Sequence, residues 1–167
     1  MGDPARLFVG KSVSLLRNDY LPKIERCLER LGNEDIWWRP GKESNSIGNL
    51  MLHLCGNVTQ WIVGGVGRRE YERRRQQEFD HRGPIPGSEL LERLRRVLAE
   101  AETIIAEQTS ESLASRRQIQ GYDVTVLEAI YHVVEHFGMH TGQIIMLTKL
   151  RRDEDLELWS APDRPTS

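Results

Sequence analysis

Cysteine is scarce in this chain of 167 residues, and long apolar runs are missing. The two cysteines, Cys27 and Cys55, are too few for a disulfide framework and do not form a C-x-x-C pair, which fits a reducing compartment. No run of about eighteen apolar residues could cross a bilayer, and the start MGDPARLFVG lacks the basic and then apolar order of a secretion signal. We therefore expect a cytoplasmic protein with no membrane partner.

Neither sign of charge dominates, because 23 Lys and Arg residues stand against 25 Asp and Glu residues, with a formal net charge of -2. No overall field therefore attracts nucleic acid or anionic lipid. The most basic stretch, GRREYERRRQQ, is interrupted by Glu70 and Glu72 and followed by Glu78. Since binding to phosphates needs a continuous basic stripe, which a solvated charged loop does not provide, we place nucleic-acid binding last among the function classes. The connection that contains residues 68–82 is longer than most links between helices, which indicates a segment that is either mobile or functional.

The apolar residues recur at helical spacing in four segments, and no strand-type alternation is visible. With 38 % hydrophobic residues, the length suits one domain. We predict an all-α four-helix bundle over residues 1–150 and a loosely held C-terminal tail over 151–167. The first expected helix runs from Pro4 to Gly32, with a kink or a break near Tyr20 caused by Pro22. The others run from a Ser46 cap to the glycines after residue 63, from a Ser88 cap to about Ser110, and from a Thr125 and Glu128 capping box to about Leu150.

The stretch YHVVEHFGMHTGQI holds three of the five histidines, four residues apart. On a helix, residues at this spacing differ by about 40° in direction and about 6 Å in height, so His136 and His140 can converge on one ion. His132 and His140 are about 12 Å apart along the axis, too far to share a metal with bonds of about 2 Å. One adjacent pair therefore binds, and another helix must supply the remaining ligand.

His53 on the second helix is the candidate for that ligand, because it lies off the main apolar stripe on a line with Asn57 and Gln60. Three nitrogen ligands leave positions for water or substrate, which is typical of a catalytic metal site. Zinc is our first candidate for the ion, and nickel fits similar ligands. Asn57, Gln60 and Gln143 can orient water or substrate, but each suits equally well the role of a packing amide satisfied by a neighbour.

The runs SNSIGNLMLHLCGNVTQW and HVVEHFGMHTGQI, in this order, resemble the DinB-like superfamily of metal-binding four-helix bundles. Within it the chain is most similar to a bacterial subfamily of unassigned function, and the likeness extends over nearly the whole chain, including WWRP and EFDHRGPIP. The resemblance implies a divalent ion held by His53, His136 and His140, with His132 beside them in the pocket. It also implies homodimers, and relatives that are metal-dependent hydrolases or transferases using low-molecular-weight thiols.

Our leading hypothesis is a metal-dependent enzyme, either a hydrolase or a thiol S-transferase, that acts on a small molecule. Phe137 occupies the position after His136 where an H-E-x-x-H protease carries its glutamate, which argues against peptide hydrolysis by that route. The alternative is a non-catalytic metal-containing binding or sensor module. An apolar helix face left over by the bundle would support the homodimer, but one sequence does not locate it.

Overall fold

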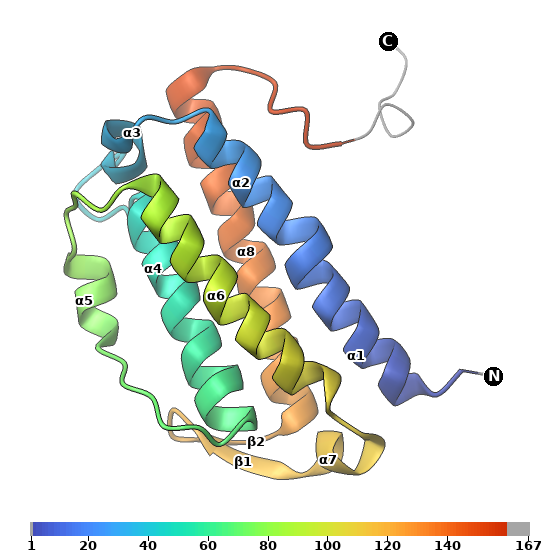
Figure 1. Ribbon diagram of the computed structural model, residues 1–167. Coiled ribbons are helices and arrows are strands. Elements are labelled where there is room, and N and C mark those ends of the chain that lie inside the picture. The colour runs from blue at the N-terminus through green and yellow to red at the C-terminus, as the bar shows by residue number, and fades with distance from the viewer. Residues whose placement is uncertain (1, 160–167) are drawn as a thin grey trace.

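The computed structural model describes residues 2–159, and four long helical rods form a bundle (Figure 1). The predicted four-helix bundle is confirmed. The first rod consists of α1 (Pro4–Ser14), the π-helical segment η1 (Leu15–Tyr20) and α2 (Leu21–Glu29), and the second consists of α4 (Ile47–Val58) and the π-helical segment η2 (Thr59–Val66). The third rod is α6 (Gly87–Ala106), and the fourth is α8 (Val126–Arg152). The connections between the rods contain three shorter helices, α3 (Asn33–Trp37), α5 (Arg75–Asp80) and α7 (Ser110–Ala114).

The first rod begins as its sequence predicts, because the Asp3 side chain accepts a hydrogen bond from the backbone N–H of Ala5 and Pro4 occupies the first turn. It does not break near Tyr20. The hydrogen bonding changes to the wider π pattern over η1 and then returns to α-helix in α2, where Pro22 lies in the first turn. The wider turn leaves room for the proline ring beside the preceding backbone, so the helix continues past it.

The helix starts at α4 and α8 are those predicted. Ser46 Oγ accepts from the backbone N–H of Asn49, and Thr125 Oγ1 accepts from that of Glu128. Ser88 was expected to cap α6, and this is wrong. The helix starts at Gly87, whose backbone N–H donates to Asn33 Oδ1, so a distant side chain satisfies the first turn in place of a serine.

The end of α6 also differs from the prediction, because the helix stops at Ala106 and α7 then begins at Ser110 with its own cap. A two-stranded antiparallel hairpin follows, of β1 (Arg116–Ile119) and β2 (Tyr122–Thr125), where no strand was expected. Its turn residues Gln120 and Gly121 have φ of 54° and 84°, the left-handed conformation of a tight hairpin turn. Strands of four residues are too short for a reliable alternation signal.

Residues 68–86 connect the second and third rods along the outside of α4, and we call them the 68–86 segment (Figure 1). Within it α5 packs against α4. Trp37, the last residue of α3, holds the segment in place. Its indole N–H donates to the backbone oxygen of Ile85, and the centroid of its ring lies 5.0 Å from that of the His81 ring, with the two planes tilted. Trp37 therefore fastens the 68–86 segment to the bundle.

The chain after α8 is tied to the bundle more closely than the loosely held tail that was expected. Leu156 is fully buried, and its backbone oxygen accepts a hydrogen bond from Arg26 Nε at 3.1 Å. The remainder of the predicted tail, residues 160–167, lies outside the described residues. Within residues 2–159, no helix combines the length and the apolar character needed to span a membrane.

Candidate metal centre

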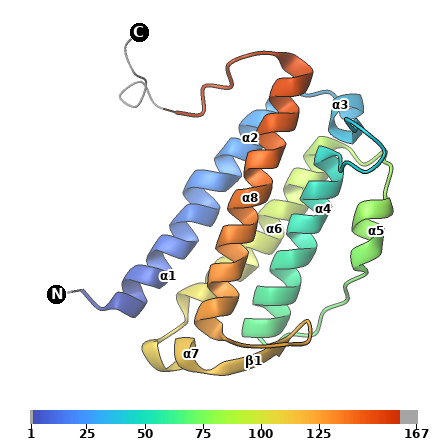
Figure 2. The ribbon, with the colours of Figure 1, turned by 180° about the vertical axis from the view of Figure 1, so that it is seen from behind.

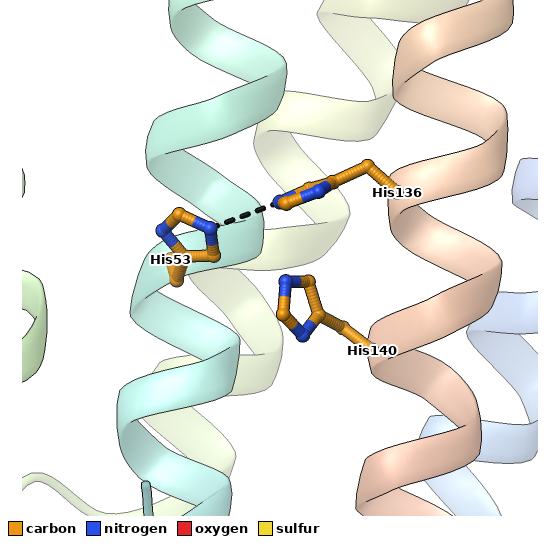
Figure 3. A group of neighbouring side chains, drawn as sticks. All are labelled: His53, His136 and His140. Atoms are coloured by element: carbon orange, nitrogen blue, oxygen red, sulfur yellow. Dashed lines mark hydrogen bonds between the residues drawn. The ribbon is translucent and has the colours of Figure 1, made fainter.

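Three imidazole rings from two rods meet between α4 and α8 (Figure 3). His53 projects from α4, and His136 and His140 project from successive turns of α8. One ring nitrogen from each lies within 4.8 Å of the others, and the Nε2 atoms of His53 and His136 are 2.9 Å apart. In the part of the chain that the structure describes, no other group of three His, Cys, Asp or Glu side chains has this geometry. The group could hold a metal ion.

The hydrogen bonds at the outer nitrogens orient two of these rings. His53 Nδ1 lies 2.9 Å from Glu78 Oε2, and His140 Nδ1 lies 2.7 Å from Gln143 Oε1. Because both oxygens are acceptors, each Nδ1 carries the proton and donates it, which leaves the Nε2 lone pair directed towards the centre of the group. His140 Nε2 is buried and has no hydrogen-bond partner. A metal ion would satisfy this nitrogen, so the residues present fit such an ion.

The rings of His136 and His140 are held in the neutral form that metal binding requires. Burial lowers the pKa of His136 to about 3, and the neighbouring rings of His140 and His53 contribute in the same direction. Burial also lowers the pKa of His140, although its hydrogen bond with Gln143 acts in the opposite direction. Both imidazoles are therefore uncharged at neutral pH, with a single ring proton each.

Glu78 and Arg73, in the 68–86 segment, are the site residues that sequence reasoning missed. Arg73 donates from Nε to Glu78 Oε1 at 2.7 Å and from Nη2 to Oε2 at 2.9 Å, and the side chains are only 4 % and 11 % exposed. Burial would raise the pKa of Glu78, but the hydrogen bonds and charges of Arg73 and His53 outweigh it and keep that pKa below its ordinary value. The length of the connection was the one hint of a function here.

The other predicted site residues lie around the ligand group and differ in the residues that they contact. Gln143 accepts from His140, as described above, whereas Gln60 Oε1 accepts from Arg73 Nη1 and so supports the 68–86 segment. His132 lies outside the ligand group, as the height difference along α8 predicts. Its Nε2 is 3.3 Å from Asn57 Nδ2.

A cavity of about 450 Å³ opens beside His53 and His136. Its wall includes Trp61 of η2 and Tyr122 of the hairpin, whose rings are stacked with centroids 6.4 Å apart. The Trp61 indole N–H donates to Gln120 Oε1 at 3.2 Å, which fastens the hairpin turn to the bundle. The hairpin that the sequence did not reveal therefore forms one side of the pocket next to the histidines.

Comparison with known proteins gives a family and a fold. The family model described as "Protein of unknown function (DUF1572)" matches residues 5–164. None of the curated proteins matches the chain.

Two solved structures have a similar fold. A conserved protein from Enterococcus faecalis aligns with a TM-score of 0.73 and 14 % sequence identity, over 87 % of this chain and 97 % of that one. A DinB-like protein from Bacillus cereus aligns with a TM-score of 0.64 and 16 % identity, over 80 % of this chain and 87 % of that one. The resemblance to DinB-like proteins is therefore confirmed at the level of the fold.

Proposed function

The chain belongs to the DUF1572 family of proteins of unknown function, and we propose that it is a metal-dependent enzyme acting on a small molecule. In this proposal His53, His136 and His140 hold a divalent cation through their Nε2 atoms. The observation that carries it is the buried, unpartnered Nε2 of His140, which faces two further imidazole nitrogens. Leaving such an atom without a partner costs about 1–3 kcal/mol, so a ligand at this point stabilises the arrangement.

The donor set favours zinc first and nickel second. Three neutral imidazoles without a carboxylate ligand suit either ion, and three protein ligands leave part of the coordination shell for water or substrate. When bound, such an ion supplies a Lewis acid that lowers the pKa of a water molecule or of a thiol.

The chain's own residues divide the remaining tasks. Glu78 and Gln143 accept hydrogen bonds from Nδ1 of His53 and of His140, which keeps the ring proton on Nδ1. Each Nε2 then keeps its lone pair for the ion. Asn57, whose Oδ1 is buried without a partner, is placed in the cavity wall to receive a donor group of the substrate. Arg75 lines the same cavity and can meet an anionic group. These features support a small, polar substrate bound beside the metal ligands.

The two reaction types left open are hydrolysis and transfer to a low-molecular-weight thiol. A nucleophilic cysteine of the chain is not favoured, because neither Cys27 nor Cys55 lines the histidine cavity and burial raises the pKa of both thiols. A transferase reaction would thus need a thiol from solution.

Nucleic-acid binding gains no support from the basic stretch. Arg73 is buried against Glu78, Arg74 pairs with Glu72, and Arg69 pairs with Glu100 on α6. Arginines engaged with carboxylates are not arranged as a continuous stripe for phosphates.

Metal analysis of purified protein tests the proposal. We expect about one zinc or nickel ion per chain, and loss of that ion in His53→Ala, His136→Ala and His140→Ala. His81→Gln is the matched control, since His81 lies in the 68–86 segment outside the group. Retention of stoichiometric metal by all three alanine variants would show that the ion binds elsewhere.

Cobalt substitution then separates an enzyme from a binding module. In the enzyme, azide binding at the open position changes the visible spectrum of the cobalt protein, and a screen of esters and of electrophiles with cellular thiols gives turnover. A spectrum unchanged by azide, with no turnover, would favour the non-catalytic module.

A further inference from the structure

A buried asparagine, Asn49, lies one helical turn before His53 on α4. None of its surface is exposed. Its Oδ1 accepts a hydrogen bond from Arg39 Nη2 at 2.7 Å, and its Nδ2 donates to the backbone oxygens of Glu78 at 2.8 Å and of His81 at 2.9 Å. Because a donor faces Oδ1 and acceptors face Nδ2, the surroundings of Asn49 fix the orientation of its amide.

These hydrogen bonds hold the C-terminal turn of α5 against α4. Figure 2 shows α5 beside α4, at the edge of the bundle. The helix has six residues, none of which is fully buried, and a helix of this length is not stable by itself in water. The backbone oxygens of its last turn have no partner within the helix. Asn49 Nδ2 satisfies that of Glu78 and lies 3.4 Å from that of Phe79, to which Arg39 Nη2 also donates at 2.9 Å.

The same turn of α5 carries two side chains that contact the His53 ring. Glu78 Oε2 accepts from His53 Nδ1 at 2.9 Å, and the centroid of the Phe79 ring lies 4.7 Å from that of the His53 ring. The Glu78 carboxylate lies directly on the backbone of α4, since a Cβ atom added at Gly56 would overlap Glu78 Oε1. The carboxylate is therefore held between α4 and the imidazole, and a small shift of α5 lengthens its hydrogen bond with His53.

We propose that Asn49 is a positioning residue of the metal centre. Its amide fixes the end of α5, and α5 places the Glu78 carboxylate on His53 Nδ1. That carboxylate orients the ring and strengthens its Nε2 as a ligand. Asn49 is not one of the ligands and acts through Glu78. This role rests on the metal site proposed above, and it is tested both with the ion and without it.

Asn49→Asp separates the two sides of the amide. The carboxylate still accepts from Arg39, but it cannot donate to the backbone oxygens of α5. Metal affinity, measured by competition with a chromophoric chelator, falls about tenfold. Asn49→Ser, which removes the amide without adding a charge, gives the same loss. The matched control is Ser46→Ala, which removes the hydroxyl that caps α4 and leaves the Nδ2 donors in place, so that thermal stability falls while metal affinity is unchanged.

A double-mutant cycle shows whether Asn49 acts through Glu78. In that case Asn49→Asp weakens metal binding in the unchanged chain but has no further effect in the Glu78→Gln background. A general effect on the bundle would weaken binding by the same factor in both backgrounds. Circular dichroism checks that each variant is folded. Equal losses in the two backgrounds, or metal binding by Asn49→Asp and Asn49→Ser as tight as that of the unchanged chain, would overturn the role.

Imidazole N–H signals in the proton NMR spectrum test the same role in the metal-free protein. The Nδ1 proton of His53, held by Glu78, gives a downfield signal that His53→Gln removes. Asn49→Asp shifts this signal upfield or abolishes it through exchange with water, whereas the Nδ1 proton of His140, which donates to Gln143 within α8, keeps its signal. An unshifted His53 signal would refute the role. An unchanged chain without metal affinity would refute the proposed function, and the His53 signal would still decide whether Asn49 positions the ring.

Discussion

Glu78 Oε2 accepts a hydrogen bond from His53 Nδ1 at 2.9 Å, although the two residues are 25 positions apart in the chain. A carboxylate that binds the outer nitrogen of a metal-ligating histidine fixes the ring orientation and strengthens the ligand. Since Arg73 holds the same carboxylate through two hydrogen bonds, the position of the His53 ring depends on a segment outside the bundle.

Glu78→Gln is expected to weaken metal binding about 10- to 100-fold, because the amide cannot provide the charge that strengthens the His53 ligand. Competition with a chromophoric chelator measures the affinity. Glu72→Gln is the control, since Glu72 belongs to the same segment and its side chain is 75 % exposed. Equal affinities in the two variants would show that Glu78 does not act on the ligand.

The stability of the metal-free protein is expected to fall as the pH decreases below 6.5. Burial lowers the pKa of His136 from 6.5 to about 3, so between these values the unfolded chain binds more protons than the folded one. Protons therefore favour unfolding across this window, and the effect disappears above it.

Urea denaturation at several pH values, with a chelator present, measures the slope. His136→Gln removes the titrating group and should give a shallower dependence of the free energy of unfolding on pH than His81→Gln. Parallel curves for these two variants would show that His136 is not held neutral.

Cys55 is expected to react slowly with iodoacetamide at pH 8. Burial raises the pKa of its thiol to about 12, and the thiolate is the reactive form. Mass spectrometry should show little modification of native protein at pH 8, faster modification as the pH rises, and rapid modification in urea. Fast labelling of the native protein would reopen the possibility that a cysteine of the chain takes part in chemistry.

Gly48→Ala and Gly10→Ala are expected to change stability in opposite directions. Both glycines lie inside helices, where alanine is intrinsically better by about 1 kcal/mol. A Cβ at Gly48 would lie 2.8 Å from the Trp37 ring, whereas a Cβ at Gly10 meets nothing within 4 Å.

Overpacking against Trp37 costs about 1–3 kcal/mol and should outweigh the gain at Gly48. Thermal unfolding measures both changes. A more stable Gly48→Ala variant would mean that Trp37, and the 68–86 segment it anchors, can shift at little cost.

The main helices could be predicted because their signals are local. Thr125 and Glu128 form a capping box from residues three apart, and His136 and His140 share a direction because one helical turn separates them. His53 could be proposed as their companion from its place on its own helix. The start of α6 could not be predicted in this way, because the backbone N–H of Gly87 donates to the side chain of Asn33, which is distant in the chain, and not to a neighbouring capping residue.

By itself the sequence determined the helical rods, the caps of α4 and α8, and the histidines that can face one another, since each depends on backbone geometry within a few residues. Only the tertiary structure decided that Glu78 and Arg73 support His53, and that Gln60 accepts a hydrogen bond from Arg73. The same holds for the hairpin that forms one wall of the adjoining cavity. These contacts join segments far apart in the chain, and their distances are set by how the rods and their connections pack.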